Sequence, residues 1–237
     1  MTAAPALSVS DLDVYLGESH ILQGVSFTVE RGRVTALLGR NGVGKTTTLR
    51  ALLGLVPRSN GRVALGEEDV TRLQTHDIVR RGVGYVPEDR DVFAGLTVDE
   101  NLRLAERRGQ GRYELVYELF PELRERGGQK AGTLSGGQQQ MVAIGRGLLN
   151  ENELLLVDEP TKGLAPLLVS DVAAALERAA ELATVLLVEQ NLAVVQRVAK
   201  DVVVLDAGRV VHEGDAGELF AEPEKVRRLL GVHGSSR

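Results

Sequence analysis

The chain contains no cysteine among its 237 residues. Disulfide bonds and cysteine-ligated zinc are therefore excluded, and the absence agrees with a reducing compartment. Long apolar runs are also missing, because no stretch approaches the ~20 apolar residues of a transmembrane helix. The first five residues, Met-Thr-Ala-Ala-Pro, lack the basic and then apolar pattern of a targeting segment. We therefore expect a soluble chain in the cytoplasm.

An excess of positive charge is absent too. Lysine and arginine number 28 against 33 aspartates and glutamates, which gives a net charge of −5 and a pI of about 5.5. Nothing in this balance creates a basic field, so we expect no nucleic acid as partner. Hydrophobic residues make up 43% of the chain and charged residues 26%. Such a chain can bury a full core, as one domain or as two closely joined lobes.

The most informative motif is a phosphate-binding loop. Residues 39–46 match G-x-x-x-x-G-K-[ST] and directly follow the apolar run 34–38. This pattern is typical of a buried strand turning into a helix, whose first backbone N–H groups would face a polyphosphate. We expect Lys45 to neutralise the β- and γ-phosphates and Thr46 to bind Mg²⁺. The expected nucleotide-binding residues of this loop are Gly39, Arg40, Asn41, Gly42, Val43, Gly44, Lys45, Thr46 and Thr47.

A glycine-rich turn could match this motif by accident. With glycine near 7% of ordinary composition, the odds of a chance match in a chain of this length are on the order of 1%. The segment is not G-x-G-x-x-G, which disfavours a dinucleotide-binding fold.

A second motif is an apolar strand that ends in two carboxylates. Residues 154–157 read Leu-Leu-Leu-Val and are followed by Asp158 and Glu159. Ligands of parallel sheets bind at this end of the strands. Alone, such a strand is ordinary, but behind a phosphate loop it predicts catalysis. Asp158 would hold Mg²⁺ through its water shell, and Glu159 would orient and deprotonate the water that attacks the γ-phosphorus.

The rest of the chain alternates between strand and helix patterns. Residues 7–14 and 25–30 alternate apolar and polar positions, as half-exposed antiparallel strands do. Continuous apolar runs typical of buried strands lie at 34–38, 154–157, 185–188 and 202–205. Between them, a capping box at residues 97–100 opens a helix that extends to about residue 107, and a second helical segment covers 113–120. Residues 89–151 show no strand pattern. The sequence therefore predicts a single domain over 1–237, with an α/β lobe (1–88 and 152–237) and an inserted helical lobe (89–151).

A third motif, Leu-Ser-Gly-Gly-Gln-Gln-Gln, covers residues 134–140. Ser135 can cap the helix that follows, in which Met141, Ile144 and Leu148 recur at helical spacing. In order along the chain, the phosphate loop, this motif and the Asp-Glu pair resemble the nucleotide-binding subunits of ATP-binding cassette (ABC) transporters, over nearly the whole length. The resemblance implies an α/β P-loop NTPase with a mainly parallel core sheet, an antiparallel β edge subdomain and an inserted helical subdomain.

The resemblance also implies roles for matching residues. Tyr15 stands where these proteins place an aromatic ring that stacks on adenine, although a tyrosine on an edge strand can also be there for packing. Two such subunits close head to tail around two nucleotides, so Ser135 and Gly137 would contact the γ-phosphate of ATP held by the other subunit. The loop at residues 163–166 would link the two sites. The implied contacts from the third motif are Ser135, Gly136, Gly137 and Gln138.

Two positions depart from the usual pattern of the family. Glu88 stands where glutamine is common, at the join to the helical lobe, and is expected at the Mg²⁺ site together with Thr46 and Asp158. Gln190 replaces the switch histidine. The four histidines of the chain fall in no motif. Gln190 can donate an amide N–H to a γ-phosphate oxygen, but it cannot become cationic.

With these departures, the chain is similar to one of the two ATPase subunits of branched-chain amino acid importers. Urea and short-amide importers share much of the pattern. The segments that carry this similarity are residues 85–90, 93–101, 117–121, 136–141, 143–146, 163–166 and 187–191.

The resemblance implies an ATP- and Mg²⁺-dependent ATPase at the inner face of the cell membrane. Its partners would be transmembrane permease subunits, a second ATPase subunit that is identical or paralogous, and indirectly a solute-binding protein. Two alternatives of other classes remain. A soluble non-transport ABC ATPase would need a coiled coil, zinc modules or a second cassette, none of which the sequence contains. A regulatory module without hydrolysis is disfavoured by Lys45, Asp158 and Glu159.

Overall fold

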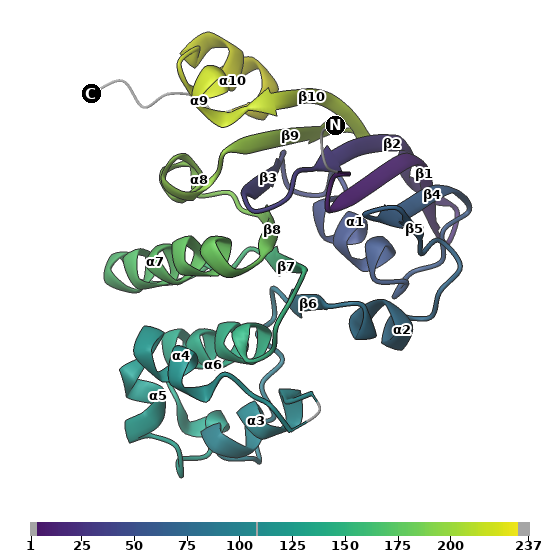
Figure 1. The fold of residues 1–237 in the computed structure, drawn as a ribbon. Coiled ribbons are helices and arrows are strands. Elements are labelled where there is room, and N and C mark those ends of the chain that lie inside the picture. The colour runs from purple at the N-terminus through teal and green to yellow at the C-terminus, as the bar shows by residue number, and fades with distance from the viewer. Residues whose placement is uncertain (1–3, 108, 232–237) are drawn as a thin grey trace.

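The computed structural model describes residues 4–107 and 109–231 of the chain. Its centre is a six-stranded sheet in the order β10-β9-β3-β8-β7-β6 (Figure 1). Strand β10 pairs antiparallel with β9, and all other neighbouring strands are parallel. The strands of this sheet are β3 (Val34–Leu38), β6 (Val83–Val86), β7 (Leu154–Asp158), β8 (Thr184–Val188), β9 (Asp201–Asp206) and β10 (Arg209–Asp215).

Both faces of the central sheet are covered by apolar side chains. In β3, Ala36 and Leu38 belong to the cluster on one face, whereas Leu37 belongs to the cluster on the other. Every position of β3, β7 and β8 is buried as a result. Strands covered on both faces read as continuous apolar runs rather than alternating ones. The four predicted buried strands are therefore confirmed.

A second, antiparallel sheet has the order β2-β1-β4-β5. Buried and exposed residues alternate along much of β1 and β2, as predicted. Helix α1 (Lys45–Leu52) packs between the two sheets, because Leu49 and Leu52 share a cluster with Val9 and Phe27 of this sheet. Strands β4 and β5 complete the sheet and were not predicted from the sequence. Its strands are β1 (Leu7–Leu16), β2 (Ser19–Val29), β4 (Asn60–Leu65) and β5 (Glu68–Asp69).

The described part of residues 89–151 is helical and contains no strand, apart from one bridge between Thr97 and Lys130. The predicted capping box is confirmed, since the Glu100 N–H donates to Thr97 Oγ1 (3.2 Å) and the Thr97 N–H donates to Glu100 Oε2 (2.7 Å). The helix ends at Ala105, slightly earlier than predicted, because Glu106 is already extended. The helices are α3 (Val98–Ala105), α4 (Tyr113–Leu119), α5 (Pro121–Glu125), a 3₁₀ turn (Ala131–Thr133) and α6 (Gly136–Leu148).

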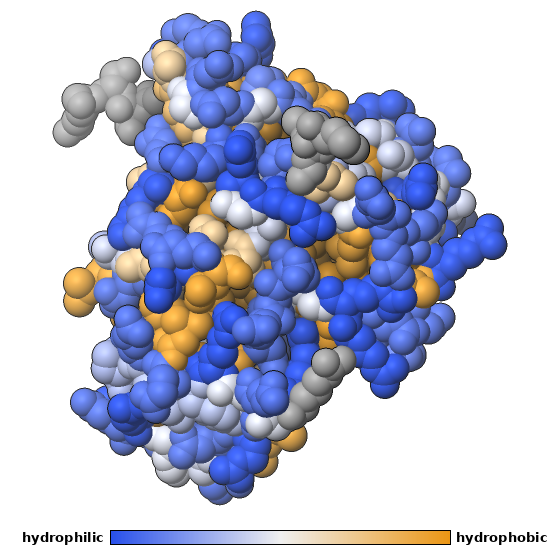
Figure 2. Space-filling view, viewed as in Figure 1, coloured by the Kyte–Doolittle hydropathy of each residue, from blue (hydrophilic) through white to orange (hydrophobic). Residues whose placement is uncertain are grey.

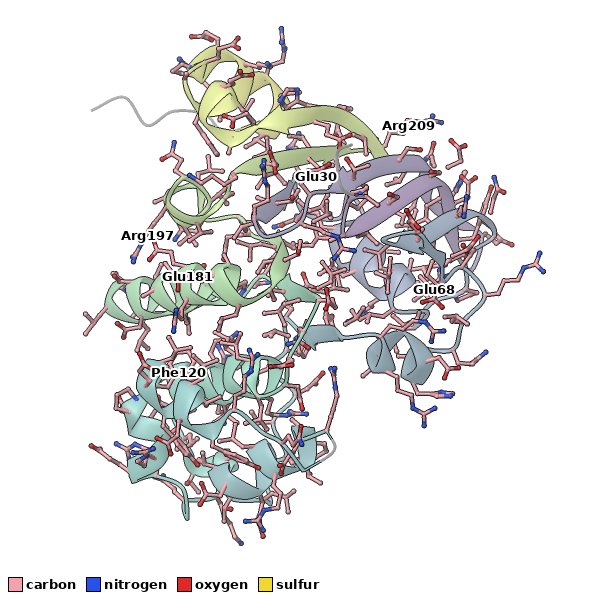
Figure 3. All side chains as sticks on the ribbon, viewed as in Figure 1. Glu30, Glu68, Phe120, Glu181, Arg197 and Arg209 are labelled. Carbon is pink, nitrogen blue, oxygen red and sulfur yellow. The ribbon has the colours of Figure 1, made fainter. Side chains whose placement is uncertain are left out.

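These helices share one apolar cluster with the central sheet. Phe120, labelled in Figure 3, is 1% exposed and belongs to the same cluster as Leu102 of α3 and Val157 of β7. Helix α6 packs against β6 and α7, and so joins the helical segment to the sheet. The division into two lobes stays a prediction.

The remaining helices pack on both faces of the sheet: Ile78 of α2 belongs to one apolar cluster, whereas α7 to α10 contribute to the cluster on the other face (Figure 1). Among the described residues, no helix combines the length and the apolar character needed to cross a membrane. In the view of Figure 2 the surface is largely hydrophilic, with apolar residues gathered near the middle of the face. The helices are α2 (Thr75–Arg80), α7 (Pro166–Leu182), α8 (Leu192–Val198), α9 (Ala216–Phe220) and α10 (Pro223–Leu230).

Candidate functional site

The phosphate loop connects β3 to α1, as the motif predicts. Its backbone requires glycine at two positions: φ is 144° at Gly39 and 108° at Gly44. A Cβ on Gly39 would lie 2.3 Å from the carbonyl oxygen of Leu205, and a Cβ on Gly44 would lie 2.6 Å from the side chain of Leu22. Gly44 is the N-cap of α1, and no side chain in the described structure caps this helix. Its first N–H groups are therefore available to an anion.

The other loop residues surround this helix end. Val43, Thr46 and Thr47 are half-buried. The tip of the loop is exposed and consists of Arg40, Asn41 and Gly42.

Lys45 lies buried beneath the loop with its ammonium held by backbone. Its Nζ donates to the carbonyl oxygens of Gly39 (2.9 Å) and Arg40 (3.0 Å) and lies 3.8 Å from Glu159 Oε1. Burial lowers the pKa of Lys45, and the neighbouring carboxylate of Glu159 opposes that shift. The charged oxygens of a polyphosphate are stronger hydrogen-bond acceptors than two carbonyls. The Lys45 ammonium can therefore leave the carbonyls and bind phosphate oxygens instead.

Asp158 and Thr46 form the candidate Mg²⁺ site. The Thr46 hydroxyl donates to Asp158 Oδ1 at 3.2 Å. The other carboxylate oxygen, Oδ2, is buried and has no hydrogen-bond partner among the described residues. Burial raises the pKa of Asp158 to about 6. A buried carboxylate oxygen without a donor fits a cation, which supplies the missing partner.

The donor set is also appropriate for magnesium. The described residues contain no cluster of three or more His, Cys, Asp or Glu side chains that could hold a metal ion. Mg²⁺ commonly binds through one or two protein oxygens, substrate phosphates and water rather than in an all-protein cage. A hydroxyl and one carboxylate beside a phosphate loop fit that mode.

Glu159 occupies a strained and buried position. It has φ of 44° and is 6% exposed. Its backbone N–H donates to the Val188 carbonyl of the neighbouring strand (2.8 Å). Gln190 Nε2 donates to Glu159 Oε1, the same oxygen that faces Lys45. A non-glycine residue in this region of φ costs free energy and persists where the surroundings hold it, which is common at active sites.

Lys162 is a site residue that the sequence analysis missed. Its ammonium donates to Glu88 Oε1 and lies 3.7 Å from Glu159 Oε2. The hydrogen bond with Glu88 raises the pKa of Lys162. The structure therefore ties Glu88 to the loop of Glu159 through a cation, which no local pattern in the sequence indicates. Direct metal binding by Glu88 stays a prediction.

Tyr15 lies near the end of β1. It is 45% exposed, and its ring stacks on His20 with a centroid distance of 4.1 Å and an interplanar angle of 8°. His20 Nε2 lies 2.8 Å from Asp13 Oδ1. The exposed part of the tyrosine ring can take a base, so stacking on adenine stays a prediction.

The Ser-Gly-Gly-Gln motif starts helix α6. The Gln138 N–H donates to Ser135 Oγ (3.3 Å) and the Ser135 N–H donates to Gln138 Oε1 (3.0 Å), so the predicted cap is confirmed. Ser135 and Gly136 are exposed, whereas Gly137 is buried, and a Cβ there would lie 2.1 Å from Leu168 Cδ1. Among the described residues, no hydrogen bond or ion pair joins this motif to the phosphate loop.

The structure thus brings Lys45, Thr46, Asp158, Glu159 and Gln190 to one edge of the sheet. In the described part of the chain, no hydrogen bond or ion pair joins Tyr15 or the Ser-Gly-Gly-Gln motif to these five residues. Fold and site together define a phosphate-loop nucleotide hydrolase.

Comparison with known proteins narrows this class. Residues 22–162 match the family model described as ABC transporter. The high-affinity branched-chain amino acid transport ATP-binding protein BraG of Pseudomonas aeruginosa is 40% identical over 231 residues, which cover 95% of this chain and 99% of that protein. The probable branched-chain amino acid transport ATP-binding protein LivF of Archaeoglobus fulgidus is 37% identical, over 91% of this chain and 94% of that one.

A solved structure agrees with these relatives. The crystal structure of a nucleotide-free ATP-binding cassette from an ABC transporter matches with a TM-score of 0.83 and 26% identity, covering 96% of this chain and all of the other. The chain belongs to the ABC transporter family, as one of its ATP-binding proteins. The predicted fold class and the ATPase activity are thereby confirmed.

Proposed function

We propose that this chain is the ATP-hydrolysing subunit of an importer for branched-chain amino acids. The substrate class rests on BraG and LivF, two branched-chain amino acid transport ATP-binding proteins that align with this chain over nearly their whole length. The hydrolytic role rests on one observation above all, the buried Asp158 Oδ2 that has no partner among the described residues beside the phosphate loop.

The nucleotide is bound by backbone and by one ammonium. The backbone N–H groups at the start of α1 donate hydrogen bonds to phosphate oxygens. The Lys45 ammonium leaves its carbonyl acceptors and binds the β- and γ-phosphates instead. Thr46 and Asp158 would hold Mg²⁺, which would neutralise charge on the phosphates. These contacts orient the γ-phosphate toward Glu159.

Proton transfer falls to Glu159. One of its oxygens accepts from Gln190 and lies near Lys45, which fixes the direction of the carboxylate. Once Lys45 turns to the phosphates, the carboxylate accepts the proton of the attacking water. Gln190 keeps one amide N–H on Glu159 and donates the other to a γ-phosphate oxygen.

Membership of the ABC transporter family supports the proposed assembly. Two ATPase subunits, identical or paralogous, close around two nucleotides, with Ser135 to Gln138 of each facing the nucleotide of the other. The subunits bind permeases at the inner face of the membrane, and a solute-binding protein delivers the amino acid on the opposite side.

Transport assays on the reconstituted complex test this function. Vesicles that contain this chain, its permeases and the second ATPase are loaded with Mg²⁺ and ATP, and uptake of leucine is measured in the presence of the solute-binding protein. We expect uptake with the native chain and none with Glu159→Gln as the matched control. Uptake of urea or acetamide without leucine would overturn the substrate class but leave the ATPase role intact.

A further inference from the structure

Glu189 is a buried carboxylate that the mechanism above does not use. It follows β8 directly, precedes Gln190 and is 3% exposed. A buried carboxylate is costly unless hydrogen-bond donors surround it. The groups that donate hydrogen bonds to Glu189 therefore indicate which parts of the structure it holds in place.

The two oxygens of Glu189 hold two different loops. Oε1 accepts from the backbone N–H groups of Gln190 (2.8 Å) and Asn191 (2.9 Å). Oε2 accepts from the hydroxyl of Thr161 (2.7 Å), a side chain that is 6% exposed. Thr161 lies on the loop that begins with Glu159. One carboxylate thus joins the loop after β8 to the loop after β7.

The other end of the loop after β8 is held by hydrogen bonds to the start of α8. Asn191 Oδ1 accepts from the N–H groups of Ala193 (3.1 Å) and Val194 (3.4 Å), which caps α8. Between this cap and Glu189, the side chain of Gln190 extends to Glu159. The position of the Gln190 amide relative to Glu159 is therefore set by how the two loops are tied together.

We propose that Glu189 is a positioning residue for hydrolysis, which acts through Thr161 to hold Gln190 against Glu159. This inference rests on the proposed role of Glu159 as the base. Thr161 is the better site to test it, because Val is nearly isosteric with Thr but lacks the hydroxyl, whereas Glu189→Gln could still donate its amide to that hydroxyl.

The test compares Thr161→Val with Thr161→Ser, which keeps the hydroxyl, in the assembled complex. Loss of a hydrogen bond to a buried charged group predicts a fall in kcat of ~10-fold or more for Val. Thr161→Ser should keep most of the native kcat. ATP affinity, measured by titration with a fluorescent nucleotide, should stay within about 2-fold in both, because Thr161 is not in the phosphate loop, which with Lys45 makes the main contacts to the nucleotide.

A double-mutant cycle with Gln190→Ala separates positioning from general destabilisation. If Thr161 acts through Gln190, adding Thr161→Val to Gln190→Ala should lower kcat no further. A native kcat in Thr161→Val, or an undiminished further loss in the double variant, would overturn the positioning role. Glu159→Gln is measured alongside: near-native turnover there would overturn the base and the positioning role together, whereas an inactive Glu159→Gln with a native Thr161→Val overturns the positioning role alone.

Discussion

Lys162 pairs with Glu88, and the same ammonium lies 3.7 Å from Glu159 Oε2. Glu88 follows β6 at the start of the helical segment, whereas Lys162 lies on the loop after β7. The acidic residue that distinguishes this chain from the usual family pattern is therefore matched by a cation. If Glu88 moved, Lys162 would move with it, and the positive charge beside Glu159 would shift.

This pair predicts a specific defect in coupling. Glu88→Gln should leave ATP binding nearly intact but change the stimulation of hydrolysis by the membrane subunits. Lys162→Met should cause a similar change, and the double variant should be no worse than either alone. Because Lys162 is largely exposed, the melting temperature should barely move. Unchanged coupling in both single variants would show that the Glu88–Lys162 pair has no role in it.

Replacement of the base gives a second prediction. Glu159→Gln keeps the shape of the side chain but cannot accept the proton, so hydrolysis should fall by ~10²–10⁴. ATP should still bind and trap a closed dimer. Phosphate release measures the first effect, and size-exclusion chromatography with ATP measures the second. A near-normal rate of phosphate release would remove Glu159 from its catalytic role.

Lys45→Ala should lose nucleotide affinity, because a charge-assisted contact to phosphate disappears without a replacement. The fold should persist, since the native ammonium bonds to two backbone carbonyls of its own loop. Titration with a fluorescent nucleotide measures the affinity, and circular dichroism checks the fold. An unchanged affinity contradicts the assignment of the phosphate loop.

Gln190, which replaces the switch histidine, gives a prediction about the pH dependence of hydrolysis. With saturating Mg²⁺ and ATP, hydrolysis between about pH 5.5 and 8 should lack the inflection that a histidine with a reference pKa of ~6.5 imposes. Gln190→His should introduce that inflection, while Gln190→Ala should slow hydrolysis without abolishing binding. An inflection that is the same in the native chain and in Gln190→Ala would have to come from another group.

Asp158 predicts how stability depends on pH without metal and nucleotide. Its pKa rises from 3.8 to about 6 on folding, so the folded state favours the protonated form. The stabilising contribution is full below pH ~4 and is lost as the pH rises through about 6, a change of about 3 kcal/mol for a shift of about two pKa units. Melting temperatures across this range measure the effect. Asp158→Asn should remove this component, and addition of Mg²⁺ with ATP should reduce it.

Much of the fold could be predicted because its signals are local. The run 34–38 and the three other buried strands are continuous because the sheet is covered on both faces, and the phosphate loop needs glycine for its own backbone geometry. Strands β4, β5, β6 and β10 were missed because they are short or have polar residues, as in Arg209–Asp215.

The site was predicted unevenly for a related reason. Lys45, Thr46, Asp158 and Glu159 belong to motifs whose spacing reflects direct contact with phosphate or metal. The contacts of Lys162 with Glu88 and of Thr161 with Glu189 join residues that are distant in the sequence. Only the arrangement of β6, β7 and β8 side by side in the sheet brings those pairs together.

The tight packing of Gly137 on Leu168 has a mechanical consequence. Leu168, near the start of α7, packs against Gly137 at the start of α6, and any side chain at position 137 would displace the Leu168 side chain. The start of α6 is therefore in direct contact with α7, the helix that follows the Glu159 loop. We expect a larger residue at position 137 to alter this contact between the helical segment and the loop after Glu159.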